Sequence, residues 1–338
     1  IVNNYGIIDI NNPTQVISKP DGGNNTLELA YGNNMTNSVD IINFDGASGQ
    51  QGTVKIGTIV GAYDPAVSSY LTNSVLYFNL IDKIIYTGSN VFRAIWGTAQ
   101  SVNLTINNGN NNVSLFVNGG NNVIDLGYTG SSDKIAFVSY TDTKNAGIIY
   151  DAMNGGNIVS FSDGRGNDIL KNFNTIQGSD GNDSVTLKSG LTFISSGGND
   201  TLIGNGAVYE LYKSHTETIA DFANNTITKY QGSTLIGVDA LSGVGFNQFT
   251  NSSTSRKATI YASNVNDMSF EFRAGVVDFY SSESTNNTTN SGNAILTTHY
   301  ENFNSSITFA NINGSRWQIT KQGGQFNDTA SSISVLNG

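Results

Sequence analysis

Short stretches in which apolar and polar residues alternate recur along the chain. In Ser269–Phe272 and in residues 307–310, the aromatic and branched side chains fall on every second position. A period of two places these side chains on one face of a strand, so such stretches predict β-strands with one buried face. Residues 75–86 are more continuously apolar and predict a buried strand pair. Helical periodicity is scarce, and residues 214–223 are the best place for one short helix.

A glycine-rich turn precedes several of these stretches. Three segments align without gaps as Gly-Gly-Asn followed by Asn or Asp and a short apolar stretch: residues 22–29, 119–126 and 197–204. Two close copies and one degenerate copy occupy residues 163–170, 178–185 and 109–113. Glycine permits the backbone angles of tight turns, and Asn or Asp can bond the turn's own backbone. Each copy therefore predicts a turn that feeds a strand.

The copies that keep Asp follow one another at similar spacings. Asp168 and Asp183 are 15 residues apart (183 − 168), and Asp183 and Asp200 are 17 apart (200 − 183). These steps are close to one solenoid turn of two roughly nine-residue units. We expect an all-β fold with a β-roll or β-helix-like solenoid segment inside a larger β-sheet domain, residues 1–230. Residues 231–338 lack the turn and predict a second domain of antiparallel, sandwich-like sheet.

The composition supports a folded β-protein and narrows its partners. The 338 residues include 15 Tyr and 17 Phe, which argues against disorder, and only 12% are charged, about half the usual share. The net charge of −10 argues against nucleic acid, because phosphates require clusters of Lys and Arg. The same negative charge is compatible with the binding of divalent cations. No apolar stretch reaches the ~18 residues of a membrane-spanning helix. The start at Ile1 indicates a processed product, or a leader outside this numbering.

No pattern of catalytic residues stands out. The chain has no Cys and only two His, His215 and His299, and it lacks an HExxH run, so zinc, redox and metalloprotease chemistry are not supported. The segment 235–245 contains Asp239 and Ser242 but no G-x-S-x-G nucleophile turn. We therefore do not expect an enzyme. Paired carboxylates from distant strands leave a β-helical polysaccharide-degrading enzyme as a lesser alternative.

The Asp-containing turns have the chemistry of a calcium site. Calcium takes six to eight oxygen ligands from carboxylates, amides and backbone carbonyls. A glycine-rich turn can direct its carbonyls inward, and an Asp at its end adds a charged oxygen. A second turn stacked on the first completes the shell, so metal binding and folding are coupled. The other possibility is that these are purely structural turns, which a chain rich in Gly and Asn forms from composition alone.

Residues 163–204 resemble the repeats-in-toxin (RTX, haemolysin-type) nonapeptide, Gly-Gly-x-Gly-x-Asp-x-apolar-x. The three copies keep the glycine two positions before Asp and the apolar residue two positions after it. Asp163, Ser179 and the pair Ser195 and Ser196 stand where the motif has glycine. The resemblance covers about 42 of the 338 residues. It implies a calcium-bound parallel β-roll and type I secretion, in a family of toxins, proteases, adhesins and surface-layer (S-layer) proteins.

By this resemblance, Asp168, Asp183 and Asp200 are side-chain ligands of calcium, and nearby turn residues supply carbonyls. The full implied set is Asp163, Gly164, Gly166, Asp168, Gly178, Asp180, Gly181, Asp183, Gly197, Gly198 and Asp200. Asn replaces Asp in the copies at Asn25, Asn112 and Asn122, so weak or empty sites are expected there.

The leading functional hypothesis is a secreted structural protein of the cell surface. It would be an S-layer or extracellular filament subunit that assembles with copies of itself and is stabilised by calcium. A cell-surface glycan or lipopolysaccharide is a further candidate partner. The main alternative is an RTX-type adhesin that binds glycans as a monomer.

Overall fold

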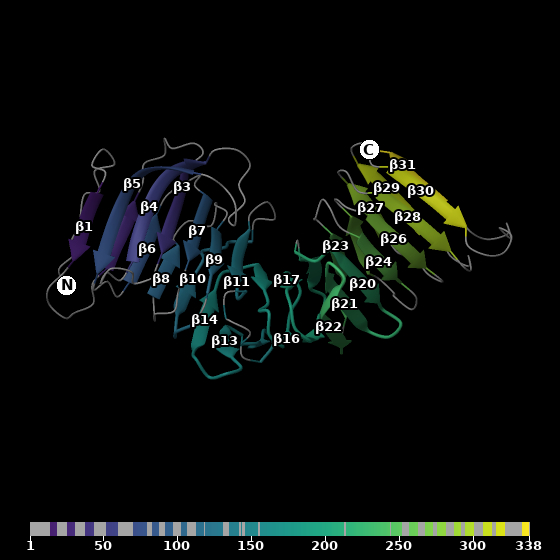
Figure 1. Ribbon diagram of the computed structural model, residues 1–338, viewed down its shortest axis with the longest axis horizontal. Coiled ribbons are helices and arrows are strands. Elements are labelled where there is room, and N and C mark those ends of the chain that lie inside the picture. Colours follow the sequence, from purple (N-terminus) through teal and green to yellow (C-terminus); the bar gives the residue numbers. More distant parts are fainter. Residues whose placement is uncertain are drawn as a thin grey trace. The chain divides into compact units, whose positions relative to one another are not determined.

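Figure 1 shows the computed structural model as a ribbon. The structure describes part of the chain with its side chains and further strands as backbone only. Side chains are described for residues 103–106, 113–117, 119–130, 135–141, 143, 146–154, 156–212, 214–243, 245–250, 257–262, 268–271 and 276–280. The other strand residues given below are described as backbone. This described part contains strands, turns and bends but no helix, and thus none long and apolar enough to cross a membrane.

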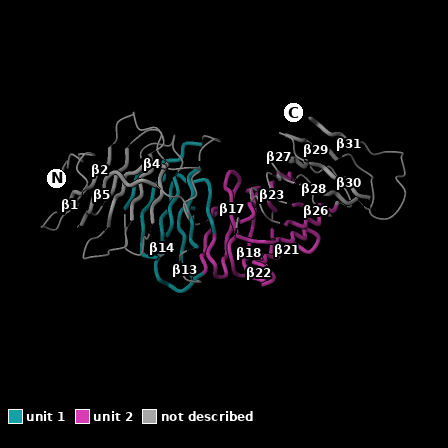
Figure 2. The backbone as a smooth tube through the Cα atoms, turned by 45° about the horizontal axis from the view of Figure 1, so that its top comes forward, with its two compact units in different colours: residues 1–146, 155–177 teal, residues 147–154, 178–338 magenta. Residues whose placement is uncertain are grey.

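The chain forms two compact units, coloured separately in Figure 2. Unit 1 comprises residues 1–146 and 155–177, and unit 2 comprises residues 147–154 and 178–338. The boundary predicted near residue 230 would instead separate two domains, and these do not correspond to the two units. That domain boundary stays a prediction.

Unit 1 holds two sheets, 1A and 1B. In spatial order, sheet 1A consists of β1 (Thr14–Ser18), β5 (Tyr70–Asn79), β4 (Gly52–Ile59), β3 (Ser38–Asn43), β7 (Phe92–Trp96), β9 (Val113–Phe116), β11 (Ala136–Ser139) and β15 (Thr175–Gln177). Sheet 1B consists of β2 (Thr26–Ala30), β6 (Lys83–Thr87), β8 (Asn103–Ile106), β10 (Val123–Asp125), β14 (Asn167–Lys171) and β13 (Ile158–Phe161).

Unit 2 also holds two sheets, 2A and 2B. Sheet 2A consists of β17 (Thr192–Ser195), β19 (Val208–Leu211), β23 (Gln248–Asn251), β25 (Ser269–Phe272), β27 (Asn287–Ser291), β29 (Ile307–Ile312) and β31 (Ile333–Asn337). Sheet 2B consists of β12 (Ile148–Asp151), β16 (Ser184–Thr186), β18 (Thr201–Ile203), β22 (Thr234–Ser242), β21 (Thr226–Gln231), β20 (Glu217–Asp221), β24 (Lys257–Tyr261), β26 (Val276–Ser281), β28 (Ile295–Tyr300) and β30 (Arg316–Lys321).

Successive strands of unit 2 alternate between its two sheets. Strand β16 pairs in parallel with β18, and β17, which lies between them in sequence, pairs in parallel with β19 in the other sheet. The same alternation runs from β23 to β31. Antiparallel pairing is confined in unit 2 to the described meander β20–β21–β22. In unit 1, β3–β4–β5 and β13–β14 pair antiparallel.

The interior consists of stacked apolar rows. In sheet 2B, Val185 and Leu202 are partners in adjacent strands, and both are buried, whereas Ser184 beside them is exposed. In-register parallel strands place equivalent side chains above one another, so one apolar position per strand builds a continuous core. Unit 1 repeats this arrangement with Leu104, Ile124 and Leu170.

Aromatic rings form a second row inside unit 2. The buried rings of Phe193, Tyr209, Phe249 and Phe270 occupy matching positions of four consecutive strands in sheet 2A. The Tyr209 and Phe249 rings stack with centroids 5.4 Å apart. Each such ring buries about 150–250 Å², so this row contributes much of the apolar burial in unit 2.

The structure confirms the all-β prediction and corrects three finer expectations. From β23 onward the strands pair in parallel, not antiparallel as expected for residues 231–338, because each strand pairs with the next strand but one along the chain. Only β22, at the start of that range, has an antiparallel partner among the described strands, β21. The expected helix at 214–223 is wrong: β20 lies there, and Thr218, Ala220 and Phe222 are buried with the period of a strand. The two strands expected within 75–86 are present as β5 and β6, but they lie in different sheets, so the expectation that they pair with each other is wrong.

Candidate functional site

The Asp of each glycine-rich turn faces the protein interior. Asp168, Asp183 and Asp200 have 0%, 3% and 1% of their surface exposed. Each precedes by two residues a buried apolar side chain of the following strand, and positions two apart lie on the same face. The local sequence therefore places these carboxylates at the end of the apolar rows. Ionised carboxylates are costly to bury, so their partners determine what they can do.

Asp168 is held by neutral donors. Its Oδ1 accepts hydrogen bonds from the backbone N (3.1 Å) and the side-chain Nδ2 (2.7 Å) of Asn122, and its Oδ2 accepts one from the Tyr140 hydroxyl (3.0 Å). Burial raises the pKa of Asp168 to about 6, although these hydrogen bonds oppose the shift. Asp168 therefore titrates close to neutral pH.

Asp183 is held in a similar way in unit 2. Its Oδ1 accepts from the Ile148 backbone N (2.8 Å) and from Ser179 Oγ (2.6 Å), and its Oδ2 accepts from the Ser179 backbone N (2.9 Å). Its own backbone N donates to Asp200 Oδ1 at 2.9 Å. Burial, and secondly the nearby Asp200 carboxylate, raise the pKa of Asp183 well above its usual range.

Asp200 contacts a buried lysine of the meander. The Lys229 side chain, on β21, is fully buried, and its Nζ donates to Asp200 Oδ2 (2.9 Å), Ser195 Oγ (2.7 Å) and the Gly197 carbonyl (3.2 Å). The same Nζ lies 2.5 Å from Asp239 Oδ1 in an ion pair. Burial would lower the pKa of Lys229, but the Asp239 and Asp200 carboxylates outweigh it and raise this pKa.

Asp239, on β22, is the fourth buried carboxylate. Its Oδ2 accepts a hydrogen bond from the Tyr209 hydroxyl at 2.7 Å. Burial raises the pKa of Asp239 to about 7, and Asp200 adds to this effect, whereas Lys229 opposes it. One ammonium is therefore shared between two buried carboxylates.

Close backbone contact between stacked turns requires their glycines. A Cβ on Gly198 would lie 2.1 Å from the Gly181 carbonyl oxygen, and a Cβ on Gly237 would lie 1.7 Å from the Gly198 carbonyl oxygen. In unit 1, a Cβ on Gly166 would lie 1.8 Å from the Gly120 carbonyl oxygen. These distances leave no room for any side chain, so the glycine of the G-x-D pattern is a packing requirement.

An asparagine ladder runs along the outside of the same turns. Asn182 Oδ1 accepts from the Asn199 backbone N (2.8 Å), and Asn199 Oδ1 accepts from the Val238 backbone N (2.9 Å). In unit 1, Asn121 Oδ1 accepts from the Asn167 backbone N (2.9 Å). The residue just before each Asp thus links a turn to its neighbour.

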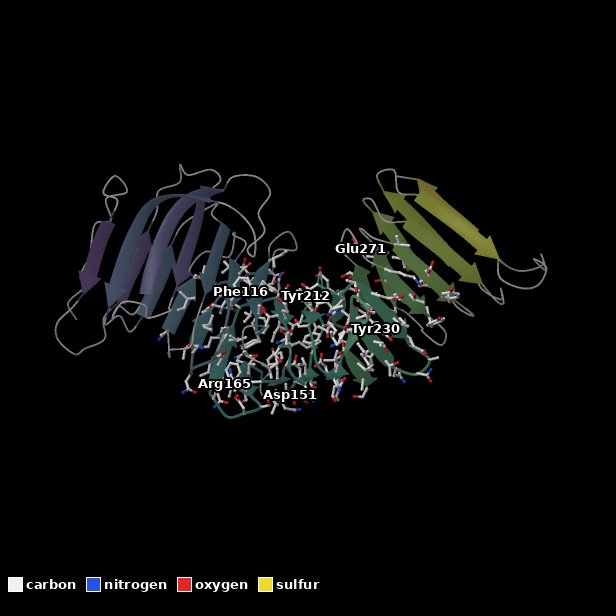
Figure 3. All side chains as sticks on the ribbon, viewed as in Figure 1. Phe116, Asp151, Arg165, Tyr212, Tyr230 and Glu271 are labelled. Atoms are coloured by element: carbon white, nitrogen blue, oxygen red, sulfur yellow. The ribbon has the colours of Figure 1, made fainter. Side chains whose placement is uncertain are left out.

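The other predicted ligands have varied surroundings. Asp163 is exposed and forms an ion pair with Arg165, which lies on the turn between β13 and β14. Arg165 is labelled in Figure 3. Hydrogen bonding by Arg165 lowers the pKa of Asp163. Gly164 is also exposed. Asp180 is exposed and accepts from the Gly197 backbone N at 3.3 Å.

The two remaining glycines of the second turn are buried. Gly181 donates its N–H to Ser179 Oγ at 3.0 Å. A Cβ on Gly178 would lie 2.2 Å from Asp183 Oδ2. Among the Asn copies, Asn122 is buried beside Asp168, whereas Asn25 and Asn112 lie outside the described residues.

Two residues of this site were missed in the sequence, Asp239 and Lys229. Residues 237–241 (Gly-Val-Asp-Ala-Leu) repeat the G-x-D-x-apolar spacing of the recognised turns. Val238 in place of Asn concealed this copy. Lys229 gave no signal, because a lysine in an alternating strand is ordinarily on the solvent side.

The fit of calcium differs between the turns. At Asp200, four oxygens that could coordinate a metal already surround the Lys229 ammonium, so a metal does not fit beside it. At Asp168 and Asp183, a calcium ion would have to replace N–H or O–H donors. Among the residues with described side chains, no group of three His, Cys, Asp or Glu forms a metal centre. Calcium at Asp168 and Asp183 stays a prediction.

Comparison with known proteins adds no relative: no protein-family model matches the chain, and no curated protein matches it significantly.

Proposed function

We propose that the chain is a secreted structural protein of the cell surface that assembles with copies of itself into a sheet or filament. The observation that carries this proposal is the alternation of parallel strands between two sheets in unit 2. We interpret this alternation as a β-solenoid, in which each turn contacts its neighbours and the stack extends in one direction. Such a scaffold suits an extended, repetitive structural role.

The described buried polar groups support a structural rather than a chemical role. Asp168, Asp183 and Asp200 bond to stacked turns and to neighbouring side chains in the interior. Catalytic carboxylates must reach a substrate, whereas these three have at most 3% of their surface exposed. Their partners link successive turns, which is the task of a scaffold.

Calcium is part of the proposal at two turns. The similarity to the RTX nonapeptide and the buried carboxylates of Asp168 and Asp183, held by neutral donors, support a divalent cation that would neutralise them there. Lys229 supplies a positive charge at the Asp200 turn instead. Metal binding at the first two turns would favour the folded state by mass action.

Sedimentation velocity of the purified chain, in calcium and in excess EGTA, tests this function. We expect large species in calcium that dissociate in EGTA. A monomer under both conditions, together with binding on a glycan array, would favour the adhesin alternative. Release of oligosaccharides from a polysaccharide panel would instead support the enzyme.

A further inference from the structure

The chain contains the same buried arrangement twice, with different charges. In unit 1, β10 pairs in parallel with β14, which pairs antiparallel with β13. In unit 2, β18 pairs in parallel with β22, which pairs antiparallel with β21. In unit 1, the residue after Asn122 is paired in the strand register with the residue after Asp168. In unit 2, the residue after Asp200 is paired in the same way with the residue after Asp239.

The registers match residue by residue. Asp168 pairs with Val159 across β13, and Asp239 pairs with Ile227 across β21. Two residues further along those antiparallel strands lie Phe161 and Lys229. Phe161 donates its backbone N–H to Gly166, and Lys229 is the partner of Gly237, the equivalent glycine.

The tyrosine partners also correspond. The Tyr140 hydroxyl donates to Asp168 Oδ2 at 3.0 Å, and the Tyr209 hydroxyl donates to Asp239 Oδ2 at 2.7 Å. Two positions then differ together between the units. Where unit 1 has neutral Asn122 and Phe161, unit 2 has Asp200 and Lys229.

This paired difference conserves charge in the interior. The unit 1 arrangement contains the Asp168 carboxylate with neutral donors, and the Phe161 ring packs edge-to-face on Tyr140 with centroids 5.6 Å apart. The unit 2 arrangement contains a second carboxylate at Asp200 and an ammonium at the position of the ring. A buried ammonium without that carboxylate, or the reverse, would be strongly unfavourable.

The surroundings of the ammonium are those of a cation site. Four oxygens, one each from Ser195, Gly197, Asp200 and Asp239, lie between 2.5 and 3.2 Å from Nζ. An ammonium has only three hydrogens to donate, so this oxygen shell exceeds its hydrogen-bonding capacity. Two of the four oxygens come from different carboxylates.

We infer that the Lys229 ammonium is a built-in cation occupying an oxygen-lined cation site in unit 2. This turn of the stack consequently needs no metal, and removal of the ammonium leaves a site that takes a divalent cation such as calcium. The inference concerns the Asp200 turn alone and is independent of self-assembly and of location.

Thermal unfolding of Lys229→Ala, with and without calcium, tests the inference. In EGTA we expect the midpoint to fall by about 10 °C, because a buried pair loses one partner. Millimolar calcium should raise the midpoint of Lys229→Ala by several degrees more than that of the wild type. The Lys229→Ala/Asp239→Asn variant, with one ligand neutralised, should lose most of this additional gain. Equal calcium shifts in Lys229→Ala and the wild type would overturn the inference.

A second variant keeps the test decisive if Lys229→Ala fails to fold. Asp200→Asn/Lys229→Phe copies the unit 1 arrangement into unit 2. Lys229→Phe alone should lower the thermal unfolding midpoint, and the double variant should recover at least half of that decrease. It should also show no more calcium response than the wild type. A double variant as unstable as Lys229→Phe would show that Lys229 does not compensate Asp200, and would overturn the inference.

Discussion

At the scale of single residues, the buried aspartates differ in what neutralises them. Asp200 and Asp239 share the Lys229 ammonium, whereas Asp168 has hydrogen bonds only from neutral groups in Asn122 and Tyr140 among its described contacts. A buried carboxylate held by neutral donors is stabilised less than one held by a cation. Asp168 is therefore the residue through which pH should act on unit 1.

The first prediction concerns pH. The pKa of Asp168 is about 6 in the folded chain and ~3.9 in an unfolded one, so the folded state binds the proton more tightly. The stability that this proton confers is present below pH ~4 and is lost as pH rises through 6. The loss from Asp168 is about 3 kcal/mol, from ~2 pKa units at ~1.4 kcal/mol each. Asp183 and Asp239, whose pKa values are also raised, act in the same direction.

Urea unfolding at pH 5 and pH 7.5, in EGTA, measures about half of this loss, ~1.4 kcal/mol, because the unfolded carboxylate is already ionised at pH 5. We expect a lower free energy of unfolding at pH 7.5, and a smaller difference between the two pH values in Asp168→Asn. The amide keeps an acceptor for Asn122, and the Tyr140 hydroxyl can rotate to accept. An unchanged pH difference in the variant would contradict the assignment.

The second prediction concerns the turn glycines. Gly198 and Gly164 have almost the same backbone angle, φ +77° and +76°, but a Cβ meets the Gly181 carbonyl at 2.1 Å in the first and nothing within 4 Å in the second. Alanine at either position lowers the free energy of unfolding by about 1 kcal/mol, because a residue with a Cβ is strained in the left-handed backbone conformation. Gly198→Ala must also displace a neighbouring turn, so we expect a loss of more than about 3 kcal/mol. Similar losses by chemical denaturation in both variants would show that the turns are not in close contact.

At the scale of elements, neighbouring turns are held together by side chains that cap backbone groups. The Asn199 side chain accepts from the Val238 backbone N, and Asn182 accepts from the Asn199 backbone N. Each of these bonds joins one strand start to the next. The outer ladder thus reinforces the parallel register that the buried rows define.

The third prediction follows from this ladder. Asn199→Ala removes the acceptor for Val238 and should cost about 1 kcal/mol, a typical net value for one hydrogen bond. Backbone hydrogen exchange should accelerate at Val238. Asn157→Ala, at another exposed position, is the matched control and should change neither quantity. Unchanged exchange at Val238 in Asn199→Ala would argue against the ladder.

Strand positions could be predicted from the sequence, but pairing directions could not. Alternation places Phe270 inside and Glu271 outside whichever way the neighbouring strand runs. The pattern therefore does not indicate whether neighbouring strands are parallel or antiparallel. The helix expected at 214–223 was wrong because weakly apolar residues, Thr218 and Ala220, form the buried face. The turn-to-strand pattern at Asp183 and Asp200 was read correctly, because glycine and Asp occupy fixed positions in it.

The candidate site was predictable only in part. Asp168, Asp183 and Asp200 were identified by their spacing, and all three are buried. Only Asp183 and Asp200 lie on directly stacked turns, as their 17-residue step predicts. The 15-residue step was misread, because Asp168 lies in unit 1 and its turn stacks on that of Asn122. Lys229 reaches the Asp200 turn from a meander strand 29 residues further along (229 − 200), a distance that local sequence patterns do not span. Its role depends on tertiary pairing between β21 and β22.

At the scale of the whole molecule, calcium should act at some turns and not at others. Our fourth prediction is that calcium raises the free energy of unfolding by about 2–3 kcal/mol at 100 times its dissociation constant. Asp183→Asn should reduce that gain, whereas Asp221→Asn, at a turn outside the predicted set, should leave it intact. Urea titrations with calcium and with EGTA provide the comparison, and equal gains in all three proteins would exclude Asp183 as a ligand.

The central claim is that the chain is a structural subunit that assembles with itself. Negative-stain electron microscopy of the purified chain, prepared in calcium and again after excess EGTA, tests this claim most directly. We predict ordered sheets or filaments in calcium and their loss in EGTA. Isolated particles under both conditions, at every protein concentration tested, would contradict it.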